Sequence, residues 1–134
     1  MPSIFSKIIL GEIPCYKIAE NDNCIAFLDI SPLKKGHTLI VPKKEIDYIF
    51  DLDNETYNGL MSFAKEVACA IKKAIPCNRV GVCVIGLEVP HSHIHLIPIN
   101  TINDMNFSNS KLNLSKIEFE DIANSIRKNY SRPF

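Results

Sequence analysis

The hydrophobic and polar positions along the chain separate short apolar runs from longer amphipathic stretches. Each apolar run has the length of a strand and is bounded by polar residues, glycine or proline. The runs predict strands over Cys15–Ala19, Cys24–Ile30, Thr38–Val41, Val80–Val89 and His91–Ile99. A polar turn joins the first two runs, so we expect them to form a hairpin.

Apolar residues at helical spacing predict a long helix between Asp53, which suits the N-cap, and Pro76, which cannot continue a helix. Its apolar positions share one face: Leu60, Phe63, Ala64, Val67, Ala70, Ile71 and Ala74. We expect this face to lie against the core. A final helix is expected from Ser115 to about Lys128, because Ser115 and Glu118 have the spacing of a capping box.

Two shorter helices are predicted over Ile4–Leu10 and Ile46–Phe50, whereas Thr101–Asn113 is polar and is expected to be a loop. Strands joined by short turns and combined with separate helices indicate an α+β fold. The 134 residues (15.1 kDa) are sufficient for one domain, and we expect a single domain over residues 1–134.

The composition is that of a water-soluble globular protein. Hydrophobic residues make up 46% and charged residues 22% of the chain, and no apolar run approaches the roughly 18–20 residues of a membrane span. The formal net charge is zero and no dense basic block is present, which argues against a nucleic-acid surface. Residues 1–9 lack the pattern of a secretory signal, so we expect a cytoplasmic protein.

The five cysteines are odd in number and contain no Cys-x-x-Cys pair. This pattern argues against a disulfide framework and against a zinc site built from thiolates. We expect reduced and mostly buried thiols.

Three of the four histidines, His91, His93 and His95, fall within one window of five residues. In an extended strand alternate side chains point to the same side, so the three imidazoles would share one sheet face about 6.5–7 Å apart. The fourth histidine, His37, lies in a second strand-like stretch. Nearly the whole histidine content can therefore meet at one site.

Structural packing, metal binding and nucleophilic catalysis are three interpretations of the histidine window. Packed imidazoles without a function would lose hydration and repel one another when protonated. A metal site is less favoured, because Glu88 is the one acid close to the window and no thiolate pair is present. Nucleophilic catalysis by one imidazole is the favoured hypothesis.

The segment His91–Ile97 resembles the motif of histidine triad (HIT) proteins, a family of nucleotide hydrolases and transferases, in which apolar residues separate three histidines. Ser92 alone departs from that apolar pattern. Further segments resemble family segments in family order: Ile4–Ile9 with Gly11–Pro14, Ala26–Pro32, and Gly36–Lys44. The chain is most similar to the Hint-like branch, the purine-nucleotide-binding phosphoramidases. The resemblance implies an antiparallel five-stranded sheet with one long helix and a C-terminal helix per subunit, and a homodimer.

The resemblance also implies a mechanism without a metal or other cofactor. His93 would attack the α-phosphorus of a purine nucleotide and form a nucleotidyl-histidine that water hydrolyses. His95 would donate a hydrogen bond to the phosphate oxygens. His91 and His37 would belong to the network that sets the nucleophile's tautomer and assists the leaving group. A carbonyl within Gly86–Val89 would accept the hydrogen bond from the second ring nitrogen of His93.

For the nucleotide, the resemblance assigns Asp29 to the ribose hydroxyls, since a carboxylate suits two neighbouring donors. The base would lie in an apolar slot whose matching positions are Phe5, Ile8, Ile13, Phe27, Ile30 and Leu39. A location in the hydrophobic core would explain the apolar character of each of these residues as well as a location in the base-binding slot. A turn before Ser31 is the alternative role for Asp29.

The chain departs from the family at a zinc site that many members carry. Ser3 and Ser6 stand at the positions of a cysteine pair, and Glu45 stands at the position of a histidine. Three of the four ligands are therefore replaced, and we expect no zinc.

A second departure precedes the triad, where Gly81–Glu88 is largely β-branched and apolar although family members usually have a polar, glycine-containing loop. Glu88 would repel a polyphosphate leaving group and favour a neutral or cationic amine. The favoured hypothesis is thus a hydrolase that cleaves a purine nucleoside phosphoramidate or related mixed phosphate. The alternatives are a nucleotide-binding regulatory module with little turnover, a dinucleoside polyphosphate hydrolase, and a metal-dependent enzyme of another fold.

Overall fold

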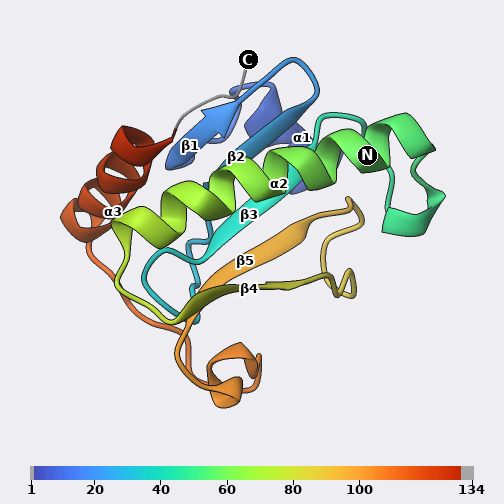
Figure 1. Ribbon diagram of the computed structural model, residues 1–134. Helices are drawn as coiled ribbons and strands as arrows, with labels where there is room; N and C mark the ends of the chain where they lie inside the picture. Colours follow the sequence, from blue (N-terminus) through green and yellow to red (C-terminus); the bar gives the residue numbers. More distant parts are fainter. Residues whose placement is uncertain (1, 131–134) are drawn as a thin grey trace.

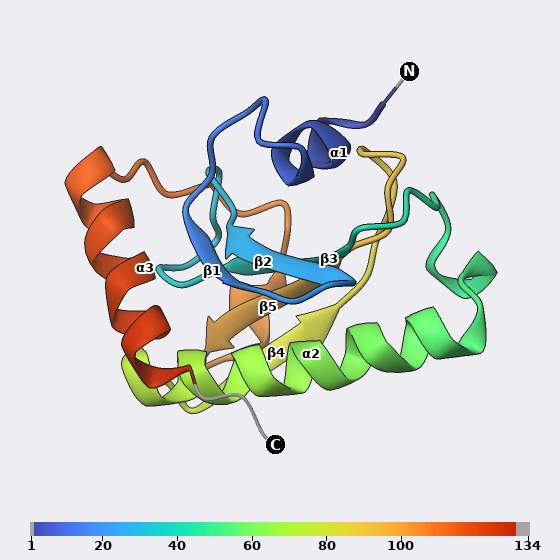
Figure 2. The ribbon, with the colours of Figure 1, turned by 90° about the horizontal axis from the view of Figure 1, so that it is seen from above.

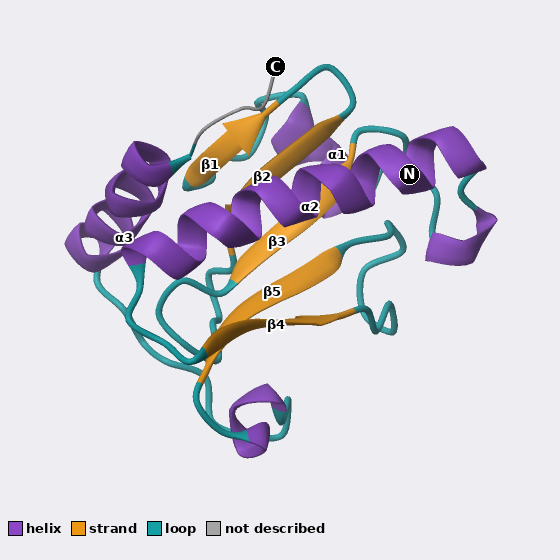
Figure 3. Cartoon of the chain, in the orientation of Figure 1, coloured by secondary structure: helices purple, strands orange, loops and turns teal. Residues whose placement is uncertain are grey.

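The computed structural model describes residues 2–130 and is built around a five-stranded sheet (Figures 1 and 3). The strands are β1 (Lys17–Glu20), β2 (Cys24–Leu28), β3 (Thr38–Pro42), β4 (Arg79–Cys83) and β5 (Ile94–Ile99). Their order is β1-β2-β3-β5-β4, and every neighbouring pair is antiparallel. The predicted α+β class and five-stranded antiparallel sheet are confirmed.

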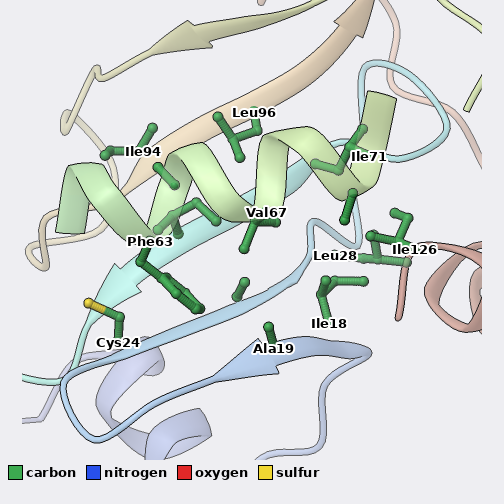
Figure 4. Close-up of a cluster of buried hydrophobic side chains, with 14 of the residues drawn as sticks. Ile18, Ala19, Cys24, Leu28, Phe63, Val67, Ile71, Ile94, Leu96 and Ile126 are labelled. Carbon is green, nitrogen blue, oxygen red and sulfur yellow. The ribbon is translucent and has the colours of Figure 1, made fainter. Parts of the chain in front are cut away.

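Helix α2 (Asn54–Ala74) lies across one face of this sheet, with α3 (Lys116–Asn129) beside it (Figure 1). The predicted face of α2 is the buried one: Leu60, Phe63, Ala64, Val67, Ala70 and Ile71 are buried, and Ala74 is half-buried. Its side chains pack with residues of β1, β2, β5 and α3, such as Ile18, Leu28, Leu96 and Ile126 (Figure 4). This cluster is the main core of the protein.

Helix α3 begins at the predicted capping box. Ser115 Oγ accepts a hydrogen bond from the Glu118 amide, and the Glu118 carboxylate accepts one from the Ser115 amide, both at 3.1 Å. The two bonds satisfy backbone donors that the first turn of a helix leaves free.

Helix α1 (Ile4–Ile9) lies on the face of the sheet opposite α2 (Figure 2). A smaller apolar cluster beneath it contains Phe5, Ile25, Phe27, Leu39 and Val41. Because α1 is short, it covers this face only in part, and the candidate site lies beside it.

The prediction of one continuous strand over Val80–Val89 was wrong, since β4 ends at Cys83. Beyond that point Gly86 adopts a φ of +76°, a left-handed conformation that glycine tolerates and that interrupts an extended strand. The chain leaves the sheet over residues 84–93 and runs toward α1 before β5 begins (Figure 2).

The strand predicted from His91 starts only at Ile94. The amide of His91 donates to the Val89 carbonyl at 2.8 Å, and the amide of Ser92 donates to the Ile46 carbonyl at 2.7 Å. These two amides therefore bond within a turn and to a loop, and they do not pair with a neighbouring strand. His95 lies in β5, whereas His91 and His93 precede it.

Smaller differences concern the ends of elements. The first two strands are shifted or shortened to the bounds given above, and the helix predicted over Ile46–Phe50 is a 3₁₀ turn at Ile49–Asp51. The predicted polar loop contains a second 3₁₀ helix, Ile102–Met105.

All five cysteines are free thiols, but Cys24 alone is buried, so the expected burial of most of them was wrong. No helix within residues 2–130 is both long enough and apolar enough to cross a bilayer.

Candidate active site

A cavity of about 450 Å³ opens on the sheet face beside α1. This volume lies in the range of small-molecule binding sites. All eight residues that the sequence assigned to a nucleotide line it: Asp29, Phe5, Ile8, Ile13, Phe27, Ile30, Leu39 and Glu88. His37, His93 and His95 also line it, whereas His91 does not.

His93 presents one bare ring nitrogen. Its Nδ1 atom lies 2.8 Å from the carbonyl oxygen of His91, and because a carbonyl can only accept, Nδ1 carries the hydrogen. Nε2 of the neutral ring then keeps its lone pair. The ring packs edge-on against Phe5, with centroids 4.9 Å apart. The acceptor is therefore the His91 carbonyl, and the expectation of one within Gly86–Val89 was wrong.

His37 and His95 are joined by a hydrogen bond whose direction is set by the backbone. The Leu33 amide donates to His37 Nδ1 at 3.0 Å, so neutral His37 carries its hydrogen on Nε2. That nitrogen lies 3.0 Å from His95 Nδ1 and donates to it. His95 then carries its own hydrogen on Nε2, which supplies an N–H donor for a ligand.

Burial keeps both of these rings neutral near pH 7. It lowers the pKa of His37 to about 3, with smaller contributions from charges that include the neighbouring His95. Burial also lowers the pKa of His95 to about 4, with a smaller contribution from His93. The rings of His93 and His95 lie 5.0 Å apart between centroids. A bare nitrogen and a neutral N–H donor thus stand side by side.

His91 belongs to a separate hydrogen-bonded cluster with Ser3, Ser6 and Glu45. Its Nε2 atom donates to the Pro42 carbonyl at 2.8 Å, and its Nδ1 atom accepts from Ser3 Oγ at 2.7 Å. Glu45 Oε1 accepts from the Ser3 amide at 2.7 Å and from the Ser6 hydroxyl at 2.5 Å. Burial lowers the pKa of His91, in keeping with this neutral tautomer.

The cluster occupies the place where the resemblance puts zinc, and its donor set does not fit that metal. Zinc sites use thiolate, imidazole and carboxylate ligands. Here two serine hydroxyls face the site, and the His91 nitrogens and the contacting Glu45 oxygen are all engaged in hydrogen bonds within the protein.

Asp29 follows β2 and contributes a half-buried carboxylate to the cavity. Oδ1 accepts from the Ser31 amide at 2.8 Å, as expected for a turn, while Oδ2 lies 3.6 Å from His37 Nε2, too far for a hydrogen bond. Burial raises the pKa of this carboxyl, and the Ser31 amide partly opposes the shift. Oδ2 is thus an acceptor for a ligand hydroxyl.

The ligand atoms of Asp29, His37 and His95 lie within 4.8 Å of one another, a spacing compatible with a metal ion. The hydrogen bonds argue against that use. The Leu33 amide occupies His37 Nδ1 and leaves the hydrogen on Nε2, so the nitrogen facing the group has no lone pair for a metal. The arrangement suits hydrogen bonding instead.

Two further cavity residues, Phe107 and Lys111, come from the loop that the sequence analysis assigned no role. The Phe107 ring lies edge-on to the ring of His95, with centroids 4.9 Å apart. Lys111 Nζ donates to the Phe107 carbonyl at 2.6 Å. A lone aromatic residue in a polar stretch was the available signal for this contact.

Comparisons with known proteins show similarity to one family. Residues 10–102, more than half of the chain, match the family described as "HIT domain". An uncharacterized HIT-like protein of Borreliella burgdorferi is 34% identical over 134 aligned positions, which cover 94% of this chain and 96% of that protein. The adenosine 5'-monophosphoramidase of Schizosaccharomyces pombe is 37% identical over 103 positions, covering 73% of this chain and 74% of that enzyme.

A solved structure of a HIT-like protein has a similar fold. The crystal structure of a HIT-like protein from Bartonella henselae, described as involved in cell-cycle regulation, matches with a TM-score of 0.82 at 32% identity. The match covers 95% of this chain and 95% of that chain.

Proposed function

The chain belongs to the HIT family, and on that premise we propose that it hydrolyses a purine nucleoside phosphoramidate or a related mixed phosphate, releasing the nucleoside monophosphate. The observation that carries this proposal is the pair of complementary nitrogens in the cavity. His93 offers a lone pair on Nε2, and His95 offers an N–H beside it. A nucleophile next to a donor for phosphate oxygens is the arrangement that phosphoryl transfer requires.

In the first step His93 Nε2 forms a bond to the α-phosphorus, and the bond from phosphorus to the leaving group breaks. The leaving nitrogen takes up a proton from solvent water and departs as an amine, and the proton released in the second step returns to solvent. The His95 N–H stabilises charge on the phosphate oxygens. His93 becomes cationic while its Nδ1–H remains on the His91 carbonyl, an acceptor that favours the charged ring.

In the second step water attacks the same phosphorus, the bond to His93 breaks, and a proton is released. His93 returns to the neutral tautomer that the His91 carbonyl selects. His37 acts through His95, because its donated hydrogen bond keeps the His95 hydrogen on the nitrogen that faces the ligand. The roles of His91 and His37 are thus in positioning.

The cavity supports a nucleotide as the substrate class. Asp29 Oδ2 is available to the ribose hydroxyls, and the apolar side chains that line the cavity suit a planar base. Glu88 lines the same cavity and disfavours a polyphosphate leaving group by charge repulsion. The similarity to the phosphoramidase of Schizosaccharomyces pombe supports an amine as the leaving group.

Two copies of the chain form a homodimer in this proposal. Strand β4 lies at the edge of the sheet and exposes Val82, which is 54% accessible. An apolar edge strand is a typical site of pairing with a second chain. A monomeric mass by light scattering would overturn this part of the proposal.

The reaction is tested by release of AMP from adenosine 5'-phosphoramidate, with the wild type beside His93→Ala. The proposal predicts steady release by the wild type and a loss of about a thousandfold or more in the variant. Thermal unfolding of both proteins controls for folding. Equal rates in the two proteins, or no release by the wild type, would refute the proposal.

A further inference from the structure

Among the side chains that line the cavity, the carboxylates outnumber the lysines, which is unfavourable for binding an anion. Asp29 and Glu88 contribute two carboxylates. His37 and His95 are neutral near pH 7, because burial lowers the pKa of both rings. An entering phosphate would therefore be repelled unless another group supplies positive charge.

Lys111 is the lysine that lines this cavity among the described residues. Its charge acts within the site, because it opposes the burial-driven rise in the pKa of Asp29 and contributes to the lowered pKa of His37. Asp29 follows β2 and His37 precedes β3, so both residues lie at the ends of central strands and far in the sequence from Lys111. The ammonium group is thus placed to influence a bound anion.

Lys111 contacts Phe107, and the Phe107 ring packs against His95, the histidine expected to face the phosphate. Its Nζ atom donates to the carbonyl oxygens of Phe107 at 2.6 Å and Asn109 at 3.2 Å, and it lies 5.9 Å from the centre of the Phe107 ring. That ring in turn contacts His95, at 4.9 Å between centroids. An ammonium group has three N–H donors, so one remains for a ligand oxygen.

The loop that carries these residues is anchored at several points. Lys34 and Asp104 form an ion pair at 3.0 Å. The Leu112 amide donates to the Pro32 carbonyl at 2.8 Å. Within the loop, the Asn109 side chain donates to the Asn103 carbonyl at 2.8 Å and stiffens it. An anchored loop positions a cation before the ligand arrives, which lowers the entropic cost of binding.

We propose that Lys111 binds the substrate phosphate and makes the site selective for nucleotides over nucleosides, with Phe107 holding the loop against His95. The inference rests on the proposed function, because it concerns the phosphate of that substrate. The remaining N–H of Lys111 donates to a non-bridging phosphate oxygen, and its charge offsets the repulsion from Asp29 and Glu88. A lysine that only caps loop carbonyls would have no such effect on ligand choice.

Calorimetric titration with AMP and with adenosine distinguishes these roles. Lys111→Gln should weaken AMP binding by about tenfold to a hundredfold, the usual effect of losing one charge-assisted hydrogen bond. Adenosine binding should change by less than about twofold, and Lys111→Arg should keep most of the affinity for AMP, since it keeps the charge. Lys72→Gln, on α2 at the opposite face of the sheet, is the matched control and should bind both ligands like the wild type.

Three other results would overturn the inference. Unchanged AMP affinity in Lys111→Gln would show that the charge does not contact the phosphate. Equal losses for AMP and adenosine would assign Lys111 a role in loop structure alone. Failure of the wild type to bind AMP would refute the proposed function and the inference with it, and is distinguishable from failure of the inference alone.

Discussion

Ser3 Oγ lies 2.7 Å from His91 Nδ1, and both side chains are buried although 88 positions separate them in the chain. His91 in turn supplies the carbonyl that accepts from His93 Nδ1. Ser3, which directly precedes α1, is thereby connected to the turn that carries His93. Hydrogen bonds hold this turn at the place where many relatives are expected to use a metal.

Replacement of Ser3 by alanine should therefore affect both stability and catalysis. Ser3→Ala leaves the buried His91 Nδ1 atom without a donor, and we expect a loss of about 1–3 kcal/mol in the free energy of unfolding. The kcat for AMP release should fall with little change in KM, because the turn holding His93 is loosened. Urea denaturation and steady-state kinetics measure the two effects.

Ser115→Ala is the matched control for that variant. Both serines are N-caps: Ser3 Oγ accepts from the Ser6 amide at the start of α1, and Ser115 Oγ accepts from the Glu118 amide at the start of α3. Loss of either cap costs about 1 kcal/mol, but Ser3 also bonds to His91. An unchanged kcat in both variants would show that Ser3 has a purely structural role.

The buried neutral histidines predict that the protein loses stability in mild acid. The folded-state pKa values of His37 and His95, about 3 and about 4, lie below the ordinary value of 6.5. Between these values the unfolded chain binds more protons than the folded one, so stability is complete above about pH 6.5 and declines as the pH falls.

Each ring contributes up to about 1.4 kcal/mol per pH unit within that window. Denaturant titrations at successive pH values between 7 and 5 measure the slope. The variant His37→Asn should show a shallower decline than the wild type, since one buried titrating ring is gone. Parallel curves for the two proteins would contradict the assignment.

Glu88 is expected to select the leaving group. Glu88→Ser removes a negative charge from the cavity, so hydrolysis of a dinucleoside polyphosphate should rise by about fivefold to tenfold relative to hydrolysis of the phosphoramidate. Glu120→Ser, an exposed site on α3, controls for the change in net charge. The idea fails if the ratio of the two kcat/KM values is the same in Glu88→Ser and the wild type.

The elements that the sequence predicted well are those with a repeated local signal. The apolar stripe of α2 and the Ser115–Glu118 capping box depend on spacing within a few residues, and both have the predicted form. The apolar positions of the cavity, such as Phe27 and Leu39, were assigned through a resemblance that covers several segments in order, and they line one cavity.

The parts that the sequence did not predict depend on contacts between distant segments. Strict alternation placed His91 on a strand, but the Ser92 amide bonds to Ile46, and His91 turns toward Ser3. Phe107 and Lys111 lie in a polar stretch with no periodicity, and the contact of Phe107 with His95 depends on how the loop is anchored. Local pattern carries no information on such contacts.

The central claim is that His93 Nε2 attacks phosphorus, and the stereochemical course at that phosphorus tests it most directly. An adenosine phosphoramidate made chiral with sulfur at the α-phosphorus is hydrolysed in isotopically labelled water, and the configuration of the product is determined. Two successive displacements, first by His93 and then by water, predict overall retention of configuration. Inversion would mean that water attacks the substrate directly, and it would contradict the covalent mechanism.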